Sequence, residues 1–121
     1  MIKLVYKILP AFISFEPINI PWVGGYATAN KIVISPKYTN DKGLLDHELT
    51  HVRQWYRTFG FHSWLYKNKK KYRLNAEVEA YKEQLKSYPD KLSYFALVLV
   101  TKPKYNLHMY TQKYVEQLLR S

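Results

Sequence analysis

Two histidines and a glutamate stand at a spacing that can hold a metal ion and activate water. His47, Glu48 and His51 form the pattern H-E-x-x-H. On a helix, residues four apart lie on one face about one turn apart, so both imidazoles can reach one ion. Two imidazoles, a further carboxylate and one open position suit zinc (Zn2+). Glu48 can then act as the general base that takes a proton from water.

A zinc site of this kind needs a third protein ligand, and two downstream glutamates compete for that role. A third histidine in the extended form of the pattern is excluded, because Gln54 and Arg57 occupy the required glycine and histidine positions. Glu77 shares a predicted helix face with Tyr81, and this face can pack on the histidine helix. We therefore expect Glu77 to be the ligand, with Glu79, on a more solvent-like face, as the alternative.

The first third of the chain must supply the support for the histidine helix. Residues 1–38 contain closely spaced prolines and short β-branched runs such as 31–35. This pattern predicts a mostly extended region with a small hairpin-rich sheet over 11–35. The pairs at 24–25 and 29–30 are turn candidates.

From residue 40 the hydrophobic spacing becomes helical, and a glycine at position 60 offers a stop for the histidine helix. His62 matches no ligand spacing and is predicted to be an ordinary histidine near that turn. We expect helices at 40–60, 63–72, 76–88 (capped by Asn75), 92–100 (capped by Asp90) and 106–119. The sequence predicts one α+β domain over residues 1–121, extended or β at 1–38 and mostly helical at 40–121, with four or five helices.

Composition narrows the classes of function. The absence of cysteine excludes a disulfide scaffold, a cysteine zinc finger and a thiol nucleophile, and it is compatible with a cytoplasmic location. Nineteen Lys and Arg against nine Asp and Glu give a formal net charge of +10, which favours acidic or phosphate-rich partners. The longest apolar stretch, 94–100, is far too short to cross a bilayer, so we expect no membrane partner.

Five of the basic residues are concentrated between Lys67 and Arg73, interleaved with Tyr66 and Tyr72. Such a segment can contact nucleic acid or another anionic polymer. A run of this kind is also typical of a solvated helix face. No nucleic-acid recognition motif accompanies it, so both interpretations stay open.

The segment DHELTHVRQW, followed by YRLNAEVEAY, resembles the gluzincin metallopeptidases. More narrowly, it is similar to small bacterial and phage-encoded metallopeptidase-like proteins with HExxHxxQ and E-x-E-A-Y elements. The similarity covers residues 31–85 and implies a zincin-like active-site helix. It assigns the metal ligands and the general base as above, to His47, His51, Glu77 and Glu48.

The same resemblance suggests three supporting roles. Tyr81 stands where the larger families carry an aspartate that orients a zinc-bound histidine, and its hydroxyl can bond a ring N–H. Gln54 can orient a ligand or the substrate, or simply bond a neighbouring loop. The run 31–35 resembles the edge strand that aligns substrate by main-chain pairing, or it is a plain strand of the sheet. A peptidase also needs an oxyanion donor, for which Tyr105, His108, Tyr110 and Arg73 are unranked candidates.

The leading hypothesis is a zinc-dependent peptidase that cleaves a peptide or protein substrate with Glu48 as general base. The alternative is a non-catalytic, zinc-stabilised binding module whose basic face contacts nucleic acid or another anionic polymer. A third possibility is a regulatory protein that has kept an inherited site. These hypotheses differ in whether metal and Glu48 are required for turnover.

Overall fold

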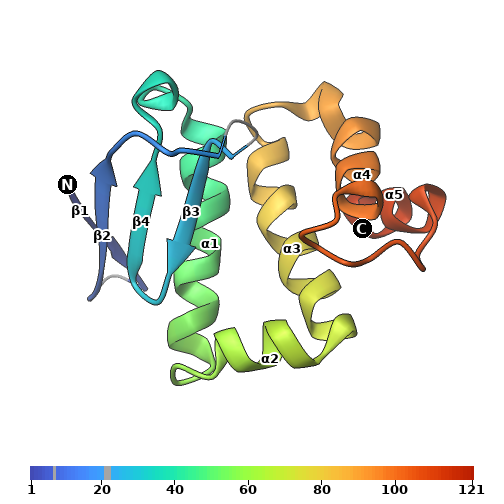
Figure 1. The fold of residues 1–121 in the computed structure, drawn as a ribbon, viewed down its shortest axis with the longest axis horizontal. Helices are drawn as coiled ribbons and strands as arrows, with labels where there is room; N and C mark the ends of the chain where they lie inside the picture. The colour runs from blue at the N-terminus through green and yellow to red at the C-terminus, as the bar shows by residue number, and fades with distance from the viewer. Residues whose placement is uncertain (7, 21–22) are drawn as a thin grey trace.

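The computed structural model describes residues 1–6, 8–20 and 23–121, and within them a four-stranded sheet is followed by five α helices (Figure 1). The α+β layout predicted from the sequence is therefore confirmed. Residues 7, 21 and 22, which belong to the expected extended region, lie outside the described residues. The strands are β1 (Ile2–Val5), β2 (Leu9–Phe15), β3 (Gly25–Thr28) and β4 (Lys31–Ile34).

The strand order is β1-β2-β4-β3, with β2 and β4 parallel and the other pairs antiparallel. The expected turn at 29–30 joins β3 and β4, and Ala29 adopts φ 55° there. The expectation that 31–35 is an edge strand is wrong, because β4 lies between β2 and β3. Parallel pairing buries Ile13 beside Ile32 in one core, and this leaves β3 at the edge.

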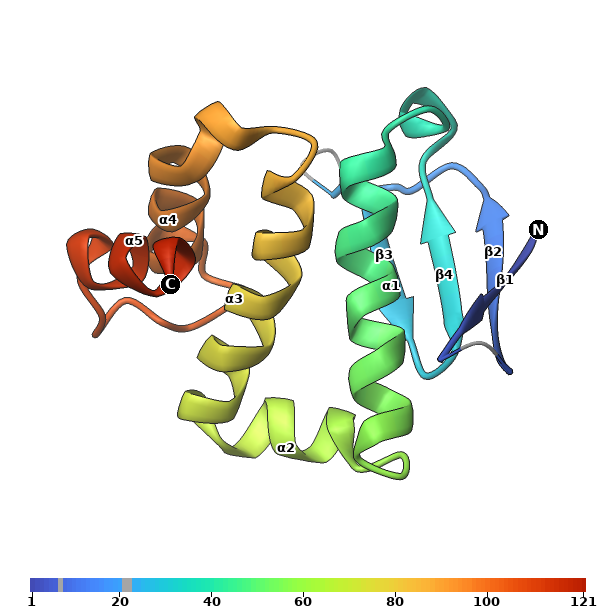
Figure 2. The same ribbon diagram turned by 180° about the vertical axis from the view of Figure 1, so that it is seen from behind.

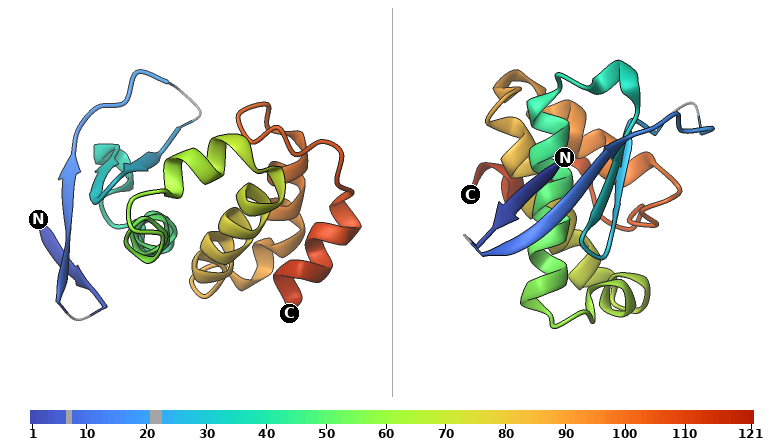
Figure 3. Two further views of the ribbon diagram at one scale, coloured as in Figure 1. Left: turned by 90° about the horizontal axis from the view of Figure 1, so that it is seen from below. Right: turned by 90° about the vertical axis from the view of Figure 1, so that its left-hand side faces the viewer.

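One helix covers the inner face of the sheet, where alternate side chains of β2 and β4 are buried. This helix, α1 (Lys42–Arg57), packs Leu49 and Val52 against the sheet. The Asp41 carboxylate caps its first turn by accepting from the Leu44 amide at 2.9 Å. Seen from below, the sheet, α1 and α3 follow one another as layers (Figure 3, left).

The next two helices differ from the expected ones. The chain forms α2 (His62–Asn68) and α3 (Lys70–Leu85), and the break between them falls at Lys69, with φ −121° and ψ 102°. The Arg73 guanidinium donates to the Tyr66 and Lys67 carbonyls, both at 2.8 Å, and so satisfies the last turn of α2. The predicted helices at 63–72 and 76–88, with Asn75 as a cap, are therefore wrong in their boundaries.

The last two helices close a second core. The short 3-10 helices are η1 (Pro36–Tyr38) and η2 (Pro89–Lys91), and the α helices are α4 (Leu92–Thr101) and α5 (Gln112–Arg120). The helix predicted at 92–100 is confirmed, although Asp90 lies in η2 and does not cap it. The last helix starts later than expected, because Asn106 is left-handed at φ 51° and Thr111 supplies the cap.

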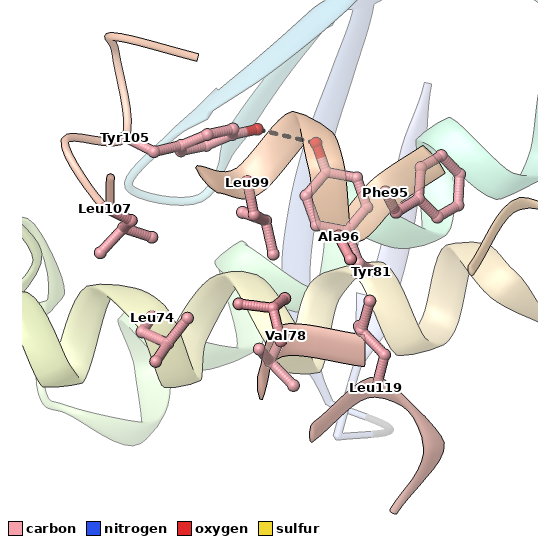
Figure 4. Packing of buried hydrophobic residues seen from close by; sticks show 10 residues of the cluster. Leu74, Val78, Tyr81, Phe95, Ala96, Leu99, Tyr105, Leu107 and Leu119 are labelled. Carbon is pink, nitrogen blue, oxygen red and sulfur yellow. Dashed lines mark hydrogen bonds between the residues drawn. The ribbon is translucent and has the colours of Figure 1, made fainter. Parts of the chain in front are cut away.

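This second core is built from α3, α4, α5 and the segment before α5 (Figure 4). The view from behind shows α4 and α5 on the side of α3 away from α1 (Figure 2). Among the described residues, no helix has both the length and the apolar character needed to cross a bilayer. The buried side chains of this core are Leu74, Val78, Tyr81, Phe95, Ala96, Leu99, Tyr105, Leu107, Val115 and Leu119.

Candidate metal centre

Three side chains with metal-ligating atoms meet between α1 and α3. His47 and His51 stand one turn apart on α1 and face Glu77 on α3. The Glu77 Oε1 atom lies 3.3 Å from His47 Nε2 and 3.3 Å from His51 Nε2. One ligand atom from each residue falls within 4.8 Å of the other two. The spacing of the histidines and the packing of α3 thus bring two nitrogens and one oxygen to one point.

The polar atoms of this cluster are withdrawn from water. His47 is 5% exposed and Glu77 is 3% exposed. Glu77 Oε1, His47 Nδ1 and Glu48 Oε2 are buried without a hydrogen-bond partner. An unpartnered buried carboxylate oxygen is unfavourable, and a divalent cation bound between Glu77 and the two imidazoles would satisfy it. Two imidazoles and a carboxylate form a donor set that fits zinc.

The electrostatics tie the histidines to the carboxylate. Burial by itself would lower the pKa of His51, but the Glu77 carboxylate overrides this effect and raises that pKa to about 9. Burial would raise the pKa of Glu77, and the nearby charge of His51 instead holds it well below its ordinary value. A proton held between His51 and Glu77 would take the place of a bound cation. A metal ion would therefore have to displace this proton in order to bind.

Gln54 fixes the orientation of the His51 ring. Its Oε1 lies 2.8 Å from His51 Nδ1, while its Nε2 donates to the Ala76 carbonyl at 2.9 Å and to Glu79 Oε1 at 2.8 Å. Because both amide hydrogens are used on α3, the oxygen accepts from His51 Nδ1–H. When His51 is neutral, its Nε2 then keeps a lone pair for the cluster. Of the two roles predicted for Gln54, this geometry supports the orientation of a ligand.

Glu79, the alternative third ligand, lies outside the cluster. Its carboxylate accepts from Arg57 at 2.6 and 3.2 Å and from Gln54. Burial would raise the pKa of Glu79, but its hydrogen bond from Arg57 lowers it, and the side chain is 43% exposed. Glu79 therefore links Gln54 to Arg57, in a chain of contacts that begins at His51.

Tyr81 contacts the site through its ring and not through its hydroxyl. The ring packs edge-on against His47 at 4.4 Å between centroids, and the hydroxyl lies 2.8 Å from the Tyr105 hydroxyl. The expected hydrogen bond from Tyr81 to a histidine ring is therefore not formed. Tyr81 follows Glu77 by one turn of α3, which carries its hydroxyl past His47 to the segment before α5. Burial raises the pKa of Tyr81 and keeps it neutral.

Two residues of α2 that the sequence did not assign to the site also face it. Tyr66 donates a hydrogen bond to Glu77 Oε2, the oxygen turned away from His51. The His62 ring lies 5.8 Å from the His51 ring, with its Nδ1 bonded to the Tyr72 hydroxyl at 2.7 Å. The i,i+4 spacing of His62 and Tyr66 is the signal that places both on one face of α2.

Two adjoining cavities, of about 360 and 240 Å³, both have Glu48 in their walls. The walls of the first include Tyr26 of β3, His62 and Tyr66. Aromatic and aliphatic residues of η1, α1 and α4 line much of the second. Both cavities share the residues Gly25, His47, Glu48, Lys104 and Tyr105.

Of the four candidate oxyanion donors, only Tyr105 lines the two cavities. Tyr105 lines both, while Arg73 binds backbone carbonyls and His108 and Tyr110 line neither.

Comparisons of the chain with protein-family models, with curated proteins and with solved structures found no match.

Proposed function

We propose that this chain is a zinc-dependent peptidase whose metal ligands are His47, His51 and Glu77. The observation that carries the proposal is the convergence of their ligand atoms within 4.8 Å, at a buried carboxylate oxygen with no other partner. A glutamate that could serve as base stands directly beside this cluster, with Glu48 Oε1 at 3.9 Å from His47 Nε2. The resemblance to gluzincin metallopeptidases points to the same roles.

The chain's own residues can account for the proton transfers of peptide hydrolysis. Zinc, when bound, supplies a Lewis acid that polarises the substrate carbonyl and a water molecule. The Glu48 carboxylate, whose Oε2 has no partner, takes one proton from that water as its oxygen bonds to the carbonyl carbon. Glu48 then gives the proton to the amide nitrogen as the C–N bond breaks. Tyr105, in the wall of both cavities, is the best placed oxyanion donor.

The cleft around Glu48 favours an extended polypeptide as substrate. β3 is the edge of the sheet, and Gly25, Tyr26 and Ala27 line the first cavity. An unpaired edge strand can hold a peptide by main-chain hydrogen bonds. The two cavities meet at Glu48 and extend along different helices, the first along α2 and the second along α4, so there is room for substrate residues before and after the cleaved bond. We infer internal cleavage rather than removal of terminal residues.

The test compares wild type with Glu48→Gln, both loaded with one zinc per chain, on a denatured protein substrate. We expect cleavage to fall by about a thousandfold or more in Glu48→Gln, with zinc content unchanged. Glu83→Gln is the matched control, because Glu83 pairs with Lys86 on α3 outside the cleft. Equal rates for Glu48→Gln and wild type would overturn the mechanism. A zinc-loaded wild type that cleaves nothing would instead favour the non-catalytic, zinc-stabilised module.

A further inference from the structure

Three large aromatic side chains stand in water at one end of the molecule. Phe59 is 91% exposed, Phe61 65% and Trp64 56%. We call these three residues the aromatic patch. They lie in the turn between α1 and α2 and on the first turn of α2, which spans the lower end of the molecule (Figure 1). Exposed aromatics clustered in this way mark an interaction surface more often than isolated ones do.

The backbone holds this patch outward. Phe59 adopts φ 53°, an unfavourable conformation for a bulky side chain, and Gly60 follows at φ 86°. The turn is closed by the Gly60 amide, which donates to the Trp55 carbonyl at 2.9 Å, and by the Phe61 amide, which donates to Thr58 at 3.0 Å. The exposure of Phe59 is therefore built into a hydrogen-bonded turn.

The stretch of sequence that carries the patch has charges of one sign. Between Glu48 and Glu77 the sequence contains no acidic residue. The seven basic residues of this interval are Arg53, Arg57, Lys67, Lys69, Lys70, Lys71 and Arg73. The four lysines are exposed, and the Lys69 ammonium lies 5.9 Å from the centre of the Trp64 ring. Aromatic side chains and unopposed lysines thus share one end of the molecule.

We propose that the aromatic patch and the four lysines dock this protein on an anionic lipid bilayer. Phenylalanine and tryptophan partition into the headgroup region, and lysines near it are attracted to lipid phosphates. The patch lies on a turn that projects from the end of the fold, and its residues line neither cavity of the site. A flat bilayer fits such a tip better than a nucleic-acid strand, which binds along a groove.

This inference revises the expectation of no membrane partner, which rested on the lack of a spanning segment. Docking does not depend on the proposed peptidase activity. The two are close in space, however, because the opposite side of α2 carries His62 and Tyr66 into the cleft. A docked molecule would therefore hold its cleft near the lipid surface.

The test measures binding of the full chain to vesicles of equal parts phosphatidylglycerol and phosphatidylcholine, by co-sedimentation and by tryptophan fluorescence. We expect binding, weaker at high salt, with a blue shift that is lost in Trp64→Phe. The triple change Phe59→Ser, Phe61→Ser, Trp64→Ser should reduce binding about 100-fold. Exchange of the four lysines for glutamine should reduce it at least about tenfold.

The matched control is Ile2→Ser, Leu4→Ser, Phe12→Ser, which removes exposed apolar side chains from the sheet and should leave binding unchanged. Circular dichroism confirms that each variant is folded. Equal binding by the patch variant and wild type would overturn the proposal, as would equal binding to pure phosphatidylcholine. Binding to a single-stranded oligonucleotide without binding to vesicles would also overturn it.

Discussion

The two apolar clusters of this protein differ sharply from the contact between α1 and α3 that separates them. One cluster joins the sheet to α1, and the other joins α3 to α4 and α5. Between them, the facing sides of α1 and α3 bury His47, Gln54 and Glu77 in place of aliphatic groups. Apolar clusters tolerate small changes, whereas a buried polar network depends on every partner. The clusters hold the two helices in place, and the polar contact between them contains the candidate metal ligands.

The largest effect should come from the carboxylate that completes the polar contact. We expect Glu77→Ala to weaken zinc binding at least about a thousandfold, because one of three ligands is lost. Glu79→Ala, two positions away and bonded to Arg57, should keep one zinc per chain. Mass spectrometry of the metal content after dialysis provides the comparison. Loss of zinc only in Glu79→Ala would reverse the assignment of the third ligand.

The apolar side of the comparison can be tested with Leu99→Ala. Leu99 is fully buried in the core of α3, α4 and α5. Its truncation should lower the free energy of unfolding by about 3 kcal/mol in urea titrations. Zinc stoichiometry should not change, because no ligand lies in that core. A variant of normal stability would mean that this cluster does not hold α3 in place.

Gln54→Ala tests how far the polar contact depends on support around the ligands. Without the amide, the His51 ring loses its orienting acceptor, and zinc affinity should fall by about 10- to 100-fold. Arg57→Gln is the milder control, because Glu79 keeps its bond from Gln54. Competition with a fluorescent chelator measures both variants. An unchanged zinc affinity in Gln54→Ala would show that Gln54 supports the packing of α1 on α3 and does not act on the metal ligands.

The pH dependence of the metal-free protein should reflect the polar contact alone. The pKa of His51 is raised from 6.5 to about 9, so its stabilising contribution is complete below pH 6.5 and is lost as pH rises through 9. The lowered pKa of Glu77 makes its own contribution disappear only as pH falls below 4.5. Urea titrations in chelator should therefore show about 3 kcal/mol less stability at pH 9.5 than at pH 6. His51→Gln should remove this difference.

The smallest effect is expected for Tyr81→Phe. The hydroxyl pairs with Tyr105 and does not reach a histidine, so zinc affinity should stay within about twofold. The lost buried hydrogen bond should lower the free energy of unfolding by about 1 kcal/mol. A tenfold loss of zinc affinity in this variant would show that the hydroxyl acts on the metal ligands after all.

Local patterns predicted the parts of the molecule whose contacts are close in sequence. The histidine helix follows from spacing and a cap within a few residues, and α4 follows from its apolar spacing. The proximity of Glu77 to the histidines agrees with the face chosen for it, since its neighbours also pack inward. Parallel pairing of β2 with β4 was missed because it depends on burial against α1, which the sequence does not display locally.

The features that the sequence patterns missed all depend on partners in another element of the fold. The Arg73 side chain, on α3, donates to the last carbonyls of α2 across the bend. The helix boundary at Lys69 therefore had no signal at Lys69 itself. Tyr66 and His62 reach the site only because that bend turns α2 beneath α1 and α3. The hydroxyl of Tyr81 goes to Tyr105, a partner 24 residues away, instead of the histidine expected.

The two cores place the ligands on opposite halves of the molecule. His47 and His51 belong to α1, which packs on the sheet, while Glu77 belongs to α3, which packs on the last two helices. An ion held by all three would act as a crosslink between these halves. Its removal by a chelator would leave them joined by the packing of α1 on α3, by the hydrogen bonds of Gln54 and Arg57 to α3, and by α2, which is a looser connection. Metal binding would then stiffen the connection between the two halves as well as change the reactivity of the site.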